Sequence, residues 1–113
     1  MPYVTREFTQ YVVYFMSGGS ASVGTPQDAQ IDCFDSSGNG AGALYFYSSG
    51  GRLPRNEHTV TGIALYFRLA RFADTLTLLQ HEKPLYLNLN TDTHVGYLST
   101  GSEPIGEQEE GDR

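Results

Sequence analysis

The chain has 113 residues, a length that suits one domain with a single core. Eight Tyr and six Phe in so short a chain, with no Trp, favour β-strands over helices. Seven basic residues against 13 acidic ones give a formal net charge of −6. The chain has one Lys and scattered Arg, so it lacks the basic cluster that binds phosphate backbones. No nucleic-acid partner is therefore expected.

Apolar runs bounded by Gly- and Ser-rich turns predict six strands. They are expected at residues 8–16, 29–34, 41–47, 62–68, 85–90 and 93–100. Between the fourth and fifth strands the apolar spacing changes to three and four residues, which predicts one amphipathic helix at about 69–81. Its apolar face would consist of Leu69, Phe72, Leu76 and Leu79. The expected fold class is mainly β (α+β), a strongly curved antiparallel sheet or small barrel of about six strands with one helix plugging a side.

Residues 1–102 are expected to form this single β-rich domain. From Glu103 onward apolar residues are few and five of six charged side chains are acidic, which predicts an acidic flexible tail at 103–113. The N-terminus lacks the pattern of a signal peptide, and no run approaches the roughly 20 apolar residues of a membrane span. A cytoplasmic protein without membrane contact is expected.

Cysteine and histidine usage indicates no metal centre. Cys33 is the single cysteine and cannot close an intrachain disulfide, so we interpret it as a small buried apolar residue. Neither His-x-x-x-His nor Cys-x-x-Cys spacing occurs, and no cofactor motif is present. We expect no metal and no cofactor.

Four predicted strands carry a tyrosine between apolar residues, at positions 14, 45, 66 and 86. Because side chains in a strand alternate between two faces, these tyrosines would share one face if the strands form one sheet. The candidate ligand or interface face comprises Tyr14, Tyr45, Tyr47, Tyr66, Arg68, Tyr86 and Asn88. Three interpretations are open: plain core of a closed barrel, the interface of a homodimer, or a pocket for a small apolar or aromatic ligand.

The sequence Ala-Leu-Tyr-Phe occurs at 43–46 and again at 64–67. We interpret the repeat as two strands with the same surroundings and not as a duplication. Taken together, these features predict a small non-enzymatic binding or interaction module that uses the Tyr face. The alternative is a small enzyme whose acid and base, Asp92 and His94, lie at the mouth of a Tyr-lined barrel.

The chain resembles short bacterial proteins of uncharacterised role, some of them carried on mobile gene cassettes. The resemblance rests on three runs: Tyr-Val-Val-Tyr-Phe-Met-Ser-Gly-Gly at 11–19, Glu-Lys-Pro-Leu-Tyr at 82–86 and Thr-Gly-Ser-Glu-Pro-Ile-Gly-Glu at 100–107. It implies no function, catalytic residue or cofactor for this chain.

Overall fold

The computed structural model describes residues 2–17, 27–48 and 52–101. Within these ranges the chain forms eight strands, a 3-10 turn and one α-helix. In chain order they are β1 (Tyr3–Phe8), β2 (Gln10–Phe15), β3 (Ala29–Phe34), β4 (Gly40–Tyr47), β5 (Glu57–Thr59), β6 (Gly62–Arg68), η1 (Leu69–Arg71), α1 (Phe72–His81), β7 (Leu85–Asn90) and β8 (Gly96–Thr100). The acidic tail predicted at 103–113 lies outside the described residues.

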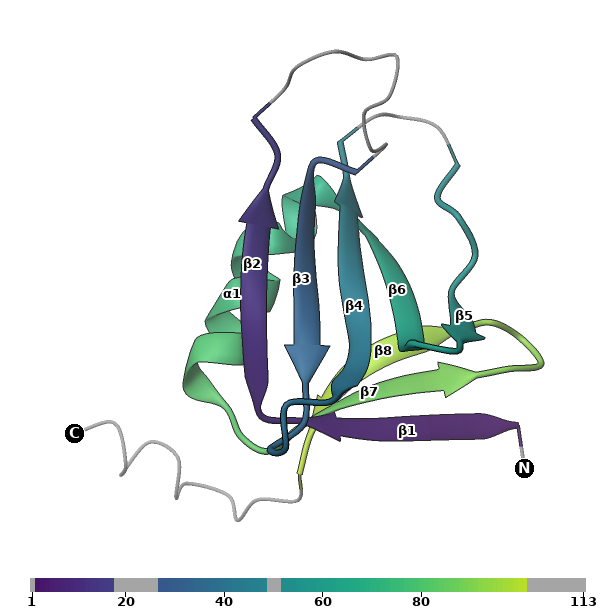
Figure 1. The fold of residues 1–113 in the computed structure, drawn as a ribbon. Helices are drawn as coiled ribbons and strands as arrows, with labels where there is room; N and C mark the ends of the chain where they lie inside the picture. Colours follow the sequence, from purple (N-terminus) through teal and green to yellow (C-terminus); the bar gives the residue numbers. More distant parts are fainter. Residues whose placement is uncertain (1, 18–26, 49–51, 102–113) are drawn as a thin grey trace.

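The strands form two sheets (Figure 1). The larger sheet has the order β2-β3-β4-β6-β5, and the smaller one has the order β1-β7-β8. All pairs are antiparallel except β4 and β6, which run parallel. The mainly β class with one helix is therefore confirmed.

The repeated Ala-Leu-Tyr-Phe sequences lie side by side on β4 and β6. The parallel register pairs Ala43 with Ala64 and Tyr45 with Tyr66, so identical residues are neighbours on both faces of the sheet. The Tyr45 and Tyr66 rings stack with centroids 5.1 Å apart on one face, and two phenylalanines stack in the same way on the other. The repeat thus reflects two adjacent strands with the same surroundings.

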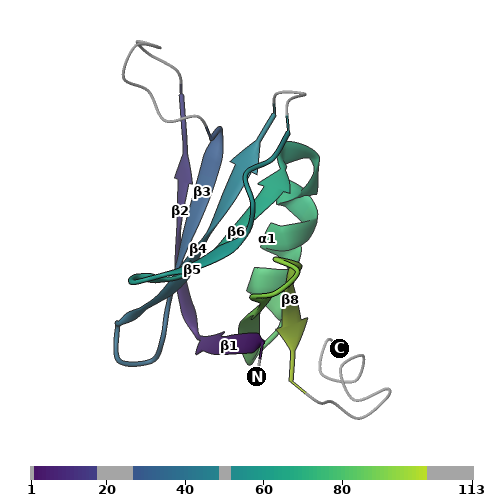
Figure 2. The same ribbon diagram turned by 90° about the vertical axis from the view of Figure 1, so that its right-hand side faces the viewer.

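The core lies on one side of the larger sheet. Both α1 and the smaller sheet pack against this side, and no helix of the described residues packs against the opposite, open side (Figure 2). Apolar side chains from both sheets and the helix meet in the core: Phe8, Ala29, Ile31, Cys33, Ala41, Leu44, Phe46, Ile63, Leu65, Leu79, Leu85, Leu87 and Leu89. Burial of these side chains supplies the main stabilising free energy, at roughly 25 cal/mol for each Å² of apolar surface.

The helix was predicted correctly, with a 3-10 turn in place of its first three residues. Leu79 is buried against the sheet, and Phe72 places its ring edge-on to Phe46 with centroids 5.1 Å apart. Leu76 is only partly buried at the margin of the core. No helix in the described ranges is both long and apolar enough to cross a membrane.

The prediction of a single strongly curved sheet or closed barrel is wrong. The described strands form two open sheets, because the chain turns sharply at Thr9 and places β1 and β2 in different sheets. Phe8 fills this corner and is almost completely buried. The antiparallel prediction also fails for β4 and β6, whose connection includes β5 and returns the chain in the same direction.

Candidate functional site

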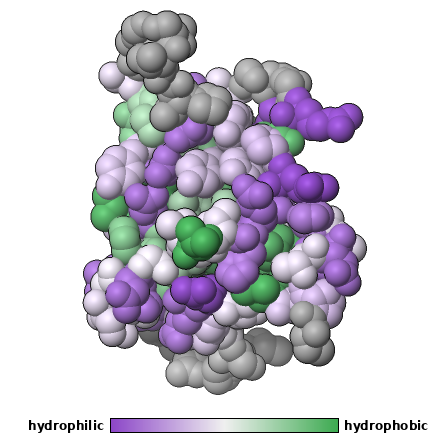
Figure 3. Space-filling model, turned by 45° about the vertical axis from the view of Figure 1, so that its right-hand side comes forward, coloured by the Kyte–Doolittle hydropathy of each residue, from purple (hydrophilic) through white to green (hydrophobic). Residues whose placement is uncertain are grey.

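The open side of the larger sheet carries most of the predicted Tyr face. One row of side chains crosses four strands and consists of Tyr14, Gln30, Tyr45 and Tyr66. The neighbouring row consists of Val12, Asp32, Ala43, Ala64 and Glu57. Figure 3 views this side obliquely and shows weakly polar surface mixed with strongly hydrophilic side chains, with hydrophobic surface in small separate areas.

Tyr47 and Arg68 extend the tyrosine surface toward the end of β4 and β6. They are register partners, and the Tyr47 ring lies 6.0 Å from the Tyr66 ring at a tilted angle. Tyr14 shares the same side but belongs to the edge strand β2, where it is exposed. The structure therefore brings Tyr45, Tyr47, Tyr66 and Arg68 together and leaves Tyr14 at the margin.

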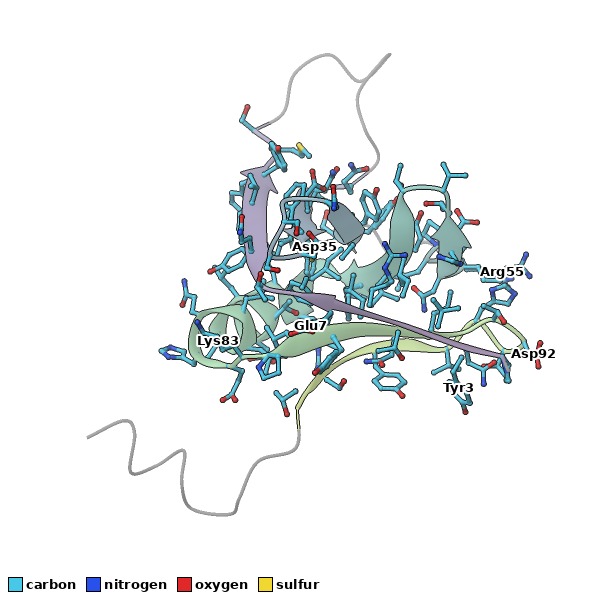
Figure 4. The ribbon with its side chains drawn as sticks, turned by 60° about the horizontal axis from the view of Figure 1, so that its bottom comes forward. Tyr3, Glu7, Asp35, Arg55, Lys83 and Asp92 are labelled. Atoms are coloured by element: carbon cyan, nitrogen blue, oxygen red, sulfur yellow. The ribbon has the colours of Figure 1, made fainter. Side chains whose placement is uncertain are left out.

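Tyr86 and Asn88 do not belong to this surface, because β7 is the central strand of the smaller sheet. Asn88 is buried there and joins all three strands. Its Oδ1 accepts a hydrogen bond from Thr5 Oγ1 at 3.0 Å, and its Nδ2 donates to Ser99 Oγ at 2.9 Å. Asn88 thus has a structural role in this sheet. Figure 4 views the sheet from below, with Tyr3 and Glu7 toward opposite ends of β1.

A hollow of about 310 Å³ opens on the tyrosine surface between β4, β6 and the β5–β6 turn. Small residues, including Ala43 and Ala64, form its floor, and Tyr45 and Tyr66 form one wall. The opposite wall comes from β5 and its turn, which project from the sheet on the side away from α1 (Figure 2). The alanines leave the space that larger side chains would fill.

The β5–β6 turn is fixed by the hydroxyl of Thr59. This hydroxyl lies 3.0 Å from the Thr61 hydroxyl, donates to Gly62 O at 3.1 Å and accepts from the Thr61 amide at 3.2 Å. The wall is therefore preorganised by local hydrogen bonds although β5 has only three residues.

Two carboxylates flank the hollow and influence the tyrosines. Burial raises the pKa of Tyr45, and the Asp32 carboxylate adds to the effect. Burial likewise raises the pKa of Tyr66, with Glu57 as the next cause. Glu57 lines the hollow itself, and no basic residue is among its lining residues. The electrostatic environment therefore favours a ligand with positive charge.

Asp92 and His94, the alternative catalytic pair, lie in the turn after β7. His94 Nδ1 is 2.9 Å from Asn56 O, and because a carbonyl only accepts, Nδ1 carries the proton. Asn56 in turn donates through Nδ2 to His94 O at 3.0 Å and accepts the Tyr66 amide at 2.8 Å through Oδ1. The imidazole thus ties the β7–β8 turn to the segment before β5. Asp92 is exposed in this turn, which lies at one end of the smaller sheet in Figure 4.

Cys33 is fully buried, as predicted. Burial, with a smaller effect of Asp32, raises the pKa of its thiol to about 12, so the thiol stays protonated and unreactive at neutral pH. Within the described part of the chain, no group of three or more His, Cys, Asp or Glu side chains could hold a metal ion.

Sequence reasoning identified the tyrosine wall of the hollow but missed its floor and its second wall. The signal for the floor was the Ala-Leu-Tyr-Phe repeat, because two identical strands in parallel register place Ala43 beside Ala64. Glu57 gave no such signal, since it lies in a segment without apolar alternation.

The chain was compared with protein-family models, with curated proteins and with solved structures. None of the three comparisons gave a match. Any functional conclusion therefore rests on the geometry of the hollow and of the surface around it.

Proposed function

We propose that this protein is a small non-enzymatic binding module and that the hollow beside Tyr45 and Tyr66 receives its ligand. The observation that carries the proposal is a preformed space of about 310 Å³ with alanines on its floor and stacked tyrosines in its wall. Small-molecule sites are typically concave, largely apolar and about 300–1,000 Å³ in volume, so this hollow suits a small ligand.

The lining predicts the chemistry of that ligand. A flat aromatic or apolar body would lie on Ala43 and Ala64 and contact the tyrosine rings. A positively charged amine would face Glu57 and Asp32 and the ring faces, where a cation–π contact contributes about 0.5–2 kcal/mol.

The test is a titration of the ¹⁵N-labelled protein followed by NMR, with 2-phenylethylamine as the probe and 3-phenylpropionate as a control of opposite charge. The amine should shift the amide resonances of Ala43, Ala64 and Tyr66 and bind about tenfold more tightly than the carboxylate. Equal affinity for the two probes would refute the charge preference. Shifts confined to other elements would refute the site.

Matched variants test separately the contributions of the Glu57 charge and of the Tyr66 ring to binding. Glu57→Gln should weaken amine binding about two- to fivefold, the range for an exposed ion pair. Glu7→Gln, on the smaller sheet, removes an equal charge and should have no effect. Tyr66→Leu keeps an apolar side chain but removes the aromatic ring, so it should lower the affinity for the amine. The matched variant Tyr97→Leu, outside the hollow, should lower this affinity less.

A further inference from the structure

Strand β2 is an unpaired edge of the larger sheet (Figure 1). Among the described strands, only β3 pairs with it. A free edge presents backbone N–H and C=O groups that can pair with another strand. The opposite edge, β5, is only three residues long, whereas β2 has six.

The register with β3 determines which backbone groups of β2 point outward. The Met16 amide donates to Asp28 O at 3.0 Å, and hydrogen-bonded pairs alternate along an antiparallel ladder. The even-numbered residues of β2 therefore bond to β3. The N–H and C=O groups of Tyr11, Val13 and Phe15 point away from the sheet, evenly spaced about Val13.

Both sides of β2 are apolar and accessible. Five consecutive residues are between 37 and 69 % exposed: Val12, Val13, Tyr14, Phe15 and Met16. No charged residue occurs from 9 to 16. Charged side chains are a common protection of edge strands against pairing, and the outer strands β1 and β5 carry them, at Arg6, Glu7 and Glu57.

We propose that β2 pairs antiparallel with β2 of a second copy, with a two-fold axis at Val13. The outward groups of Tyr11 would face those of Phe15 in the partner copy, and Val13 would face its own counterpart, giving about six backbone hydrogen bonds. On the open side Val12 would contact Tyr14 of the partner copy. Val12, Val13, Tyr14 and Phe15 would thereby each gain an apolar neighbour, and Met16 would face Gln10 of the partner copy.

A second copy of this chain fits the edge of β2 best. A strand that pairs there has to be uncharged, apolar on both sides and able to match the spacing of the outward backbone groups of β2. β2 meets all three conditions itself, and its outward groups are symmetric about one residue, as a two-fold interface requires. The interface is independent of the proposed hollow, which lies between β4, β6 and β5 and does not include β2. A dimer that binds no ligand would support this interface but not the hollow, and a monomer that binds the ligand would support the hollow but not this interface.

Light scattering on the full chain tests the interface. The protein should show twice its chain mass of 12.4 kDa. Concentrations up to about 100 µM are needed, because a strand-pairing interface is small and expected to associate weakly. Val13→Lys and Val13→Glu should each be monomeric, since like charges would face each other across the axis. An equimolar mixture of the two variants should recover the dimer, which happens only if position 13 meets its counterpart.

The control is Val60→Lys, which adds the same charge at a fully exposed apolar residue and should leave the dimer intact. If either charged variant fails to fold by circular dichroism, Val13→Cys replaces it. Facing residues of such a pair have Cα atoms about 5.5 Å apart, which permits a disulfide, so this variant should cross-link on oxidation while Val60→Cys should not. A wild-type monomer at all concentrations, or a dimer insensitive to Val13→Lys, would overturn the proposal.

Discussion

At the scale of single residues, the tyrosines of the open sheet differ from one another by their surroundings. Tyr45, Tyr47 and Tyr66 are half-buried against each other, and the cost of burying the charged form raises the pKa of all three. Tyr45 and Tyr66, which line the hollow, are neutral at physiological pH, as an ordinary tyrosine is, and they offer hydroxyl donors and ring faces there.

The raised pKa values predict a loss of stability in alkali. An unfolded tyrosine ionises near pH 10, whereas these three release their protons at a higher pH in the folded protein. Above about pH 10 the folded chain therefore holds protons that the unfolded chain has lost, so the free energy of unfolding falls as pH rises. Absorbance at the tyrosinate band should show a late phase that Tyr45→Phe with Tyr66→Phe reduces. The control is far-UV circular dichroism at neutral pH, which should show the same fold for the double variant and the wild type.

Asn88 was predicted to lie on the ligand or interface face. In the structure it is buried in the smaller sheet, where its hydrogen bonds join the three strands. Asn88→Ala should lower the free energy of unfolding by about 1–3 kcal/mol, because it removes the buried amide whose hydrogen bonds to Thr5 and Ser99 contribute about 0.5–1.5 kcal/mol each. Urea unfolding measures the change, with the exposed Asn39→Ala as control. A loss of ligand binding without loss of stability would contradict the structural role.

At the scale of elements, the parallel pairing of β4 and β6 depends on Gly62. Its φ of 130° lies in the left-handed region, and a Cβ there would collide with the backbone of Ala41. Gly62→Ala should therefore lower the free energy of unfolding by about 2 kcal/mol or more. Gly40→Ala is the control, because the nearest atom to its added Cβ, Thr61 O, is 3.5 Å away. Equal losses in the two variants would show that the parallel pairing does not restrict Gly62.

The helix offers a second test at this scale. Leu79→Ala should lower the free energy of unfolding by about 2–5 kcal/mol, the range for a buried leucine. Leu76 was expected to be equally buried, but it lies at the margin of the core, so Leu76→Ala should cost less. Thermal unfolding of both variants shows which substitution lowers the stability more. A larger loss of stability for Leu76→Ala would mean that the helix faces the sheet in another orientation.

Sequence patterns predicted those elements whose own side chains are buried. The helix and the strands around residues 31, 44, 65 and 87 show clear periodicity because one face of each enters the core. β1 was missed because Phe8 is its only fully buried side chain, and β5 because it has three residues. The pairing of β1 with β7 depends on backbone bonds to a strand that is distant in sequence, and such bonds leave no local pattern. The same limit applies to the site, where Tyr45 and Tyr66 were predicted together but Glu57 was not.

At the scale of the whole molecule, the two sheets share one hydrophobic core. The first strand of the chain pairs with β7, and the Thr5–Asn88 hydrogen bond joins residues 83 positions apart. Leu85, Leu87 and Leu89 of the smaller sheet complete the same core that the larger sheet and the helix enclose. Disturbing the smaller sheet should therefore destabilise the entire fold.

Removal of residues 1–7 tests this cooperativity. The truncated chain loses one of the two partners of β7 and exposes the apolar surface beneath β1, including that of Phe8, so its urea midpoint should fall markedly. Within each protein, far-UV circular dichroism, which reports all strands, and fluorescence of the tyrosines should give midpoints that agree with each other. Tyr3→Thr is the control, since Tyr3 is exposed and its substitution preserves the backbone pairing. An unchanged midpoint after truncation, or two separate transitions in the intact chain, would show that the sheets unfold independently.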